Sequence, residues 1–139
     1  MGPSAVRITA DTNVLVRAAV RDDPLQARVA ADILVRAELI AVPLPVLCEF
    51  VWVLLSRYGR GVGEIAASIR DLADSATVQL DRPAVEAGLA ILEAGGDFAD
   101  GVIAFEGRRL GGPIFASFDG RAVELIAAMG AETHLLPTA

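Results

Sequence analysis

The chain has 139 residues, a formal net charge of −6 and 54% hydrophobic residues. This length and hydrophobic content are typical of one globular domain and exclude a disordered chain. The negative charge argues against a protein that coats nucleic acid by bulk attraction, although local arginines could still grip phosphates. The sequence contains no lysine, which excludes a phosphate-binding Gly-Lys-Ser/Thr loop and a Schiff-base lysine.

Cys48 is the only cysteine and His134 the only histidine. An intrachain disulfide is therefore impossible, and a zinc site or a Ser-His catalytic pair is disfavoured. No basic segment followed by an apolar run opens the chain, so we expect no signal peptide. Residues 39–55 are nearly apolar, but two prolines and a glutamate within them argue against a membrane span. We expect a soluble cytoplasmic protein.

Short apolar runs alternate with segments of helical periodicity along the chain. The predicted strands span residues 5–10, 39–42, 77–80, 113–118 and 133–136. The predicted helices begin near residue 14 and then span residues 25–37, 46–57, 62–72, 84–94, 98–110 and 123–129. This alternation predicts a single α/β domain over residues 1–139, with a parallel sheet of four to five strands and helices on both faces.

Carboxylates occupy distinctive places in this pattern. Asp11 and Asp119 each end a predicted strand, at the sheet edge where open α/β folds place their ligands. Asp11 could equally well cap the helix that follows it. Asp97 follows the Gly95-Gly96 break and is well placed as a helix N-cap, which puts Asp100 in the first turn of that helix.

Glu49 is the only charged residue between Glu38 and Arg57, within an apolar predicted helix. Burying an isolated ionised carboxylate is costly unless a positive or hydrogen-bonding partner meets it. A solvent-facing stripe would explain it without function, but no other charge marks such a stripe. We therefore favour a functional role for Glu49.

In a parallel sheet all strand C-termini share one edge, so Asp11, Glu49, Asp100 and Asp119 can converge there. Four such carboxylates would raise one another's pKa unless a cation binds among them. Ligation by oxygen alone, without His or Cys, favours Mg²⁺ or Mn²⁺ over zinc.

Four segments together resemble the acidic motifs of PIN-domain ribonucleases, most closely the VapC-type toxins of bacterial toxin–antitoxin pairs. They are Asp11-Thr12-Asn13, the mid-chain Glu49, Asp97-Phe98-Ala99-Asp100 before Val102-Ile103-Ala104, and Ser117-Phe118-Asp119. Each motif alone is weak, but the four occur in the family's order over almost the whole chain. The resemblance implies a PIN-like three-layer fold and an Mg²⁺- or Mn²⁺-dependent endoribonuclease.

The resemblance also implies roles for individual residues. The catalytic site maps onto Asp11, Glu49, Asp100 and Asp119, with Asp11 and Asp100 as the direct metal ligands. Possible additional site residues are Thr12, Asn13, Ser117 and the extra acid Asp97. The chain departs from the family's pattern at two places. Gly101 stands where Ala is usual, and Ser117 stands where Thr is frequent.

The expected partners are an RNA substrate, a cognate antitoxin that covers the acidic pocket, and a second copy of the chain. We expect a homodimer because Phe50, Trp52 and the helix at residues 25–37 offer more apolar surface than a small monomer hides. Weaker candidates for contacting RNA phosphates are Arg17, Arg57, Arg60 and Arg108.

Two other functions would use the same acids. One is a non-catalytic, metal-binding α/β regulatory module of the receiver type, against which the absence of lysine counts. The other is a DNA structure-specific nuclease, for which 139 residues leave little room for added DNA-binding elements.

Overall fold

The computed structural model describes residues 6–138 and, within them, seven helices and five strands. The chain divides into two compact units: unit 1 ends at Asp81 and unit 2 begins at Arg82. The first predicted strand begins at Ala5, which lies outside the described residues. Each unit is described separately below.

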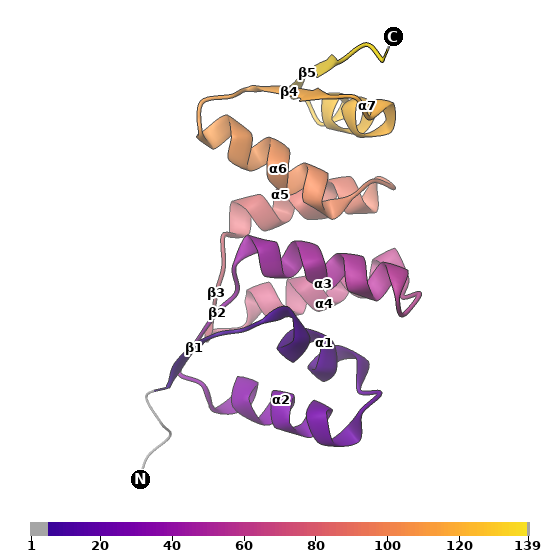
Figure 1. Cartoon of the computed structure of the whole chain (residues 1–139). Coiled ribbons are helices and arrows are strands. Elements are labelled where there is room, and N and C mark those ends of the chain that lie inside the picture. Colours follow the sequence, from indigo (N-terminus) through magenta and orange to yellow (C-terminus); the bar gives the residue numbers. More distant parts are fainter. Residues whose placement is uncertain (1–5, 139) are drawn as a thin grey trace. The chain divides into compact units, whose positions relative to one another are not determined.

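Unit 1 is built from strands that alternate with pairs of helices (Figure 1). Its elements are β1 (Arg7–Thr9), α1 (Thr12–Val20), α2 (Pro24–Arg36), β2 (Leu39–Ala41), α3 (Leu44–Ser56), α4 (Val62–Asp74) and β3 (Val78–Gln79). The three strands form a parallel sheet in the order β1-β2-β3. Residue Ile40 on β2 pairs with Ile8 on one side and with Val78 on the other.

The apolar run at residues 39–55 is divided between β2 and α3. Helix α3 begins at Leu44, two residues earlier than predicted, because Pro45 sits in the first turn, where proline costs no helical hydrogen bond. Within residues 6–138, every helix is too short or too polar to span a lipid bilayer.

The core of unit 1 forms where α3 and α4 bury their apolar stripes. Its fully buried side chains include Leu47 and Val51 from α3 and Ile65 and Ile69 from α4. Phe50 is only 4% exposed, so the prediction that it contributes surface for a partner is wrong. Its position on α3 faces inward with Leu47, Val51 and Leu54. Trp52, in contrast, is 59% exposed, as predicted.

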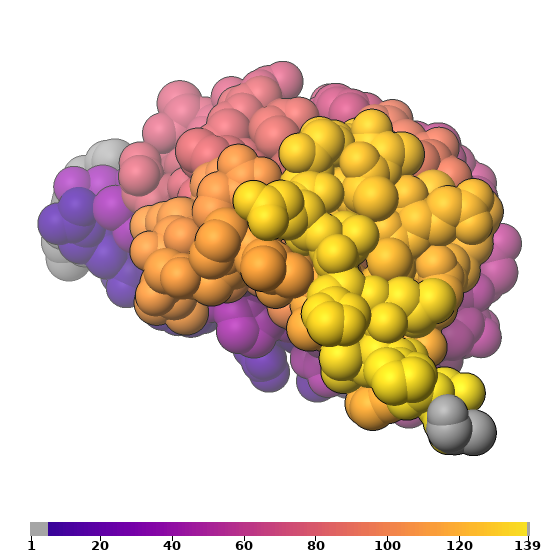
Figure 2. Space-filling model, turned by 90° about the horizontal axis from the view of Figure 1, so that it is seen from above, coloured from indigo at the N-terminus to yellow at the C-terminus, as the bar shows by residue number. Residues whose placement is uncertain are grey.

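Unit 2 joins a helical hairpin to a small β-α-β arrangement. Its elements are α5 (Arg82–Glu93), α6 (Phe98–Arg109), β4 (Ile114–Ser117), α7 (Gly120–Ala128) and β5 (Glu132–Leu135). Strands β4 and β5 pair in parallel, with Phe115 opposite Thr133. In the space-filling view, the orange atoms of the segment from α6 to β4 border the yellow atoms of α7 and β5 (Figure 2).

All paired strands are parallel, so the predicted α/β class is confirmed. The five strands of the described residues are divided between a sheet of three and a sheet of two. Helix boundaries agree with the sequence pattern to within a few residues, and the largest difference is at α7. This helix begins at Gly120, directly after its cap Asp119, rather than at Val123.

Candidate functional site

Asp11 lies at the point where β1 passes into α1. It is the N-cap of α1, and its Oδ1 accepts a hydrogen bond of 2.8 Å from the backbone N–H of Thr12. The carboxylate is exposed, whereas Thr12 is only 5% exposed. The buried Thr12 therefore anchors the start of the helix and leaves the Asp11 carboxylate facing solvent at the C-terminal end of a strand. Asn13 is exposed beside it.

Glu49 is exposed on α3. The predicted burial cost therefore does not arise, because this helix has a solvent-facing stripe even though no other charge marks it. Pro45, Glu49, Trp52 and Ser56 are all exposed at helical spacing. The stripe was missed because its other members are apolar or small rather than charged.

The stretch from Gly95 to Asp100 connects α5 to α6. Gly95 adopts a left-handed conformation with φ 97°, and the N–H of Gly96 donates to the carbonyl of Ile91 at 2.8 Å. This closes α5 in the manner of a glycine C-cap. Asp97 then caps α6, accepting from the N–H of Ala99 at 3.1 Å. The predicted cap and helix start are both confirmed.

Asp100 occupies the first turn of α6 and is half-buried. Burial is the main cause that raises the pKa of its carboxyl above the ordinary value, and the negative charges of Asp97 and Asp119 raise it further. Unit 2 thus brings three of the predicted acids close enough to interact electrostatically. A carboxylate in this setting gains from a nearby cation, which would oppose both effects.

Asp119 lies two residues after the end of β4 and caps α7. Its Oδ1 accepts hydrogen bonds from the backbone N–H groups of Arg121 at 3.0 Å and Ala122 at 3.2 Å. The backbone N–H of Asp119 itself donates to Oγ of Ser117 at 3.0 Å. Ser117 therefore supplies the hydroxyl that holds this turn, and the replacement of a frequent Thr by Ser preserves it.

The four candidate arginines differ in how they are engaged. Arg17 forms an ion pair of 2.9 Å with Asp22, and Arg60 lies 3.6 Å from Glu64. A hydrogen bond to Tyr58, with the Asp22 pair, raises the pKa of Arg17. Arg57 and Arg108 make no side-chain hydrogen bond or ion pair with residues 6–138, so these two are the better candidates for an outside anion.

The donor chemistry of these acids fits a hard divalent cation, because all candidate ligands are carboxylates. Within the described residues, no group of three or more His, Cys, Asp or Glu side chains is close enough to hold a metal ion. Asp11 and Glu49 belong to unit 1, and Asp97, Asp100 and Asp119 to unit 2. The convergence of Asp11, Glu49, Asp100 and Asp119 on one metal stays a prediction.

Gly101, one of the two departures from the family's pattern, has a structural cause. A Cβ at this position would collide with the carbonyl oxygen of Ala87 and lie 2.8 Å from the Cα of Gly88. Gly88 in turn is packed against the ring of Phe98, which is 0% exposed. Helices α5 and α6 therefore approach each other closely at Gly88 and Gly101, and Gly101 is the residue next to Asp100.

We expect Gly101→Ala to destabilise the protein by about 1–3 kcal/mol, because backbone atoms of α5 must move to admit the methyl group. This loss should exceed the helix-propensity gain of about 1 kcal/mol. The matched control is Gly107→Ala on the same helix, where a Cβ would have only an ordinary contact of 3.7 Å. Urea unfolding should show a loss for the first variant and a small gain for the second; equal gains in both would refute the close crossing.

Comparison with known proteins gives one match. A family model described as PIN domain matches residues 8–127. The matched range contains Asp11, Glu49, Asp97, Asp100 and Asp119. No curated protein and no solved structure matches the chain significantly.

Proposed function

The chain belongs to the PIN domain family, and from this membership we propose that it is a metal-dependent endoribonuclease, the toxin of a type II toxin–antitoxin pair. PIN domains are generally metal-dependent nucleases, so the membership supports a hydrolase that cleaves phosphodiester bonds. The choice of RNA as substrate and the toxin role are the proposal.

One observation carries the proposal: the four acids occur in the family's order inside the matched residues. Two of them, Asp11 and Asp119, each cap a helix directly after a strand. A third, Asp100, has a raised pKa caused by burial and by two neighbouring acids. Carboxylates arranged in this way favour cation binding.

We assign the direct metal contacts to Asp11 and Asp100, and a completing role to Glu49 and Asp119. Thr12, Asn13 and Ser117 support the acids, and Asp97 tunes Asp100 through its charge. When bound, Mg²⁺ or Mn²⁺ would lower the pKa of an attacking water and offset the negative charge that builds on the phosphate.

The test is incubation of the purified protein with labelled RNA and DNA, in EDTA and in Mn²⁺. We expect Mn²⁺-dependent cleavage of RNA within the strand and no cleavage of DNA. Cleavage of structured DNA alone would favour the DNA nuclease, and no cleavage of either would favour a non-catalytic metal-binding module. Either result would refute the proposed activity.

We further propose that the chain forms a homodimer through unit 1. The groove between α1 and α2 has a volume of about 350 Å³ and is lined mainly by apolar side chains, among them Val14, Leu25, Val29 and Ile33. Val29 is 60% exposed, and Trp52 on α3 is also exposed. Apolar surface of this kind marks interaction sites.

Light scattering at micromolar concentration should therefore give the mass of a dimer. The double variant Val29→Glu/Trp52→Glu should be monomeric, because both charges would lose their water at the interface. Leu110→Glu, which alters an exposed apolar residue of unit 2, is the control and should remain dimeric. A monomeric wild-type protein would rule out the dimer.

We also propose that a cognate antitoxin covers the acidic residues with a segment carrying an arginine, since Asp11 and Asp119 are exposed and negatively charged. Its binding should stop RNA cleavage. A tight antitoxin complex that cleaves RNA at the wild-type rate would exclude this mode of inhibition.

A further inference from the structure

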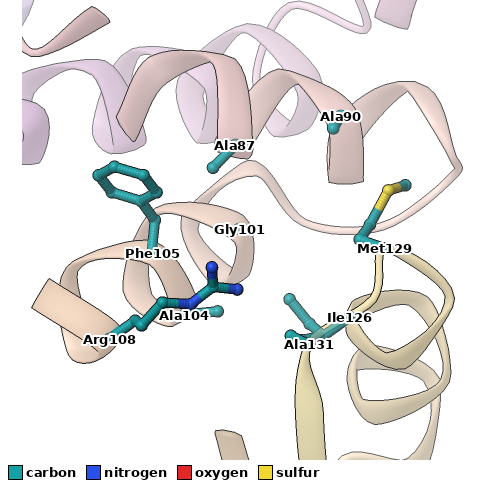
Figure 3. Close-up of a pocket in the computed structure, with 9 residues that line it drawn as sticks. All are labelled: Ala87, Ala90, Gly101, Ala104, Phe105, Arg108, Ile126, Met129 and Ala131. Carbon is teal, nitrogen blue, oxygen red and sulfur yellow. The ribbon is translucent and has the colours of Figure 1, made fainter. Parts of the chain in front are cut away.

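Unit 2 contains a pocket of about 300 Å³ on the face formed by α5, α6 and the end of α7 (Figure 3). Its walls are small or apolar, and they come from Ala87, Ala90, Gly101, Ala104, Phe105, Ile126, Met129 and Ala131. Among the described residues that line it, Arg108 is the only charged one. A hollow of this size with a single charged group has the composition of a ligand site.

Among the arginines on the described helices of unit 2, Arg108 is the one without an ion-pair partner. Arg82 lies 3.8 Å from Glu86, Arg109 lies 2.8 Å from Glu106, and Arg121 lies 4.0 Å from Glu124. Arg108 has no such partner among residues 6–138. In Figure 3 its side chain extends over Ala104 toward the middle of the pocket, with Ile126 and Met129 on the opposite side.

The pocket therefore suits a ligand with an apolar body and an anionic group. We propose that it is a subsite for one nucleotide of the RNA substrate, with the base in the apolar pocket and its phosphate on Arg108. This inference rests on the proposed ribonuclease function and extends it from the acidic site to substrate binding.

The chemistry of the walls favours a base over a peptide. A peptide segment would bring backbone N–H and C=O groups into the pocket. Of the described side chains that line it, only that of Arg108 can form hydrogen bonds, so most of these groups would lack a partner. A base can instead stack on apolar and aromatic surface while its polar edge stays in water, so binding would tolerate different bases.

The pocket also has a fixed relation to one of the acids. Asp100 and Arg108 lie on the same helix, and eight residues of α-helix rise about 12 Å. A short stretch of single-stranded RNA can span this distance. The rigid helix would thus hold a phosphate at Arg108 while another phosphate lies near Asp100.

Methyl NMR can test the subsite without any need for catalysis. The chain has two methionines, Met1 and Met129, so [methyl-¹³C]methionine labelling places one of two signals in the pocket. We expect adenosine 5′-monophosphate and uridine 5′-monophosphate to shift the Met129 signal in a saturable way, and inorganic phosphate to leave it in place. Adenosine should bind more weakly than its monophosphate.

Two kinds of variant separate the phosphate from the base. Arg108→Met should weaken mononucleotide binding by about tenfold or more, the usual effect of losing a charge-assisted hydrogen bond. Arg82→Met removes the same charge elsewhere in unit 2 and should have no effect. Ala104→Leu should fill the pocket and abolish the Met129 shift; if it fails to fold, Ala90→Leu fills the pocket from α5 instead.

The outcomes distinguish the subsite from the proposed function. If the protein cleaves RNA but mononucleotides do not shift the Met129 signal, the subsite proposal is wrong and the ribonuclease proposal stands. A saturable Met129 shift without RNA cleavage would leave a nucleotide site and overturn the ribonuclease. A shift caused by an acidic peptide but by no nucleotide, or equal binding to Arg108→Met, would overturn the subsite.

Discussion

Asp100→Asn should reduce Mn²⁺-dependent RNA cleavage by at least about 100-fold, and Asp11→Asn should do the same. The amide keeps the shape of the side chain but removes the ligand charge that holds the metal, and loss of even a supporting group around a metal often costs 10–100-fold. Cleavage of a short labelled RNA under single-turnover conditions measures the effect, and circular dichroism verifies the fold of each variant.

Asp97→Asn is the matched control. Asp97 lies one turn from Asp100 and carries the same charge, but its carboxylate caps α6 at the N–H of Ala99. We expect a smaller loss of cleavage, because this variant changes the electrostatics of Asp100 rather than the ligand itself. A loss as large as that of Asp100→Asn would mean that Asp97 is the true ligand. Wild-type cleavage rates in Asp11→Asn or Asp100→Asn would contradict the proposed metal site.

Metal binding should also stabilise the protein. A cation bound only by the native state, at a hundredfold excess over its Kd, contributes about 2.7 kcal/mol. For a chain of this size, that raises Tm by roughly 5 to 10 °C. Melting curves in EDTA and in Mn²⁺ measure the rise, and Asp11→Asn should reduce it. If Mn²⁺ shifts the melting of neither protein, the carboxylates do not share a metal.

The raised pKa of Asp100 gives the stability of the metal-free protein one pH-dependent contribution. A carboxyl whose pKa is higher in the folded state stabilises that state at low pH, and this contribution is lost as the pH rises through the folded pKa. At pH 7 the wild type therefore carries a penalty that Asp100→Asn lacks. In EDTA the variant should be more stable than the wild type at pH 7, and the difference should vanish below about pH 4.

Local chemistry made much of the fold predictable. Gly95 and Asp97 end one helix and begin the next because a left-handed glycine and a capping carboxylate act within a few residues of sequence. Pro83 near the start of α5 works in the same way. The end of β4 at Ser117 follows from a short apolar run that meets a capping acid, Asp119, two residues later.

Features that depend on distant residues were less predictable. The exposure of Glu49 and the burial of Phe50 follow from which side of α3 faces α1 and α4. Because almost every residue of α3 is apolar, its sequence does not indicate which side is buried. The division of the strands into sheets of three and two is equally a matter of tertiary pairing. The role of Gly101 needed the position of Ala87 on the neighbouring helix.

The glycine crossing of α5 and α6 also bears on how unit 2 folds. These two helices are joined by four residues, from Ala94 to Asp97, so their contacts close short loops and we expect them to form early in folding. The parallel pairing of β4 with β5 must instead wait for the α7 crossover. Asp97 and Asp100 therefore belong to the segment of unit 2 that can organise first, before the strand that delivers Asp119 finds its partner.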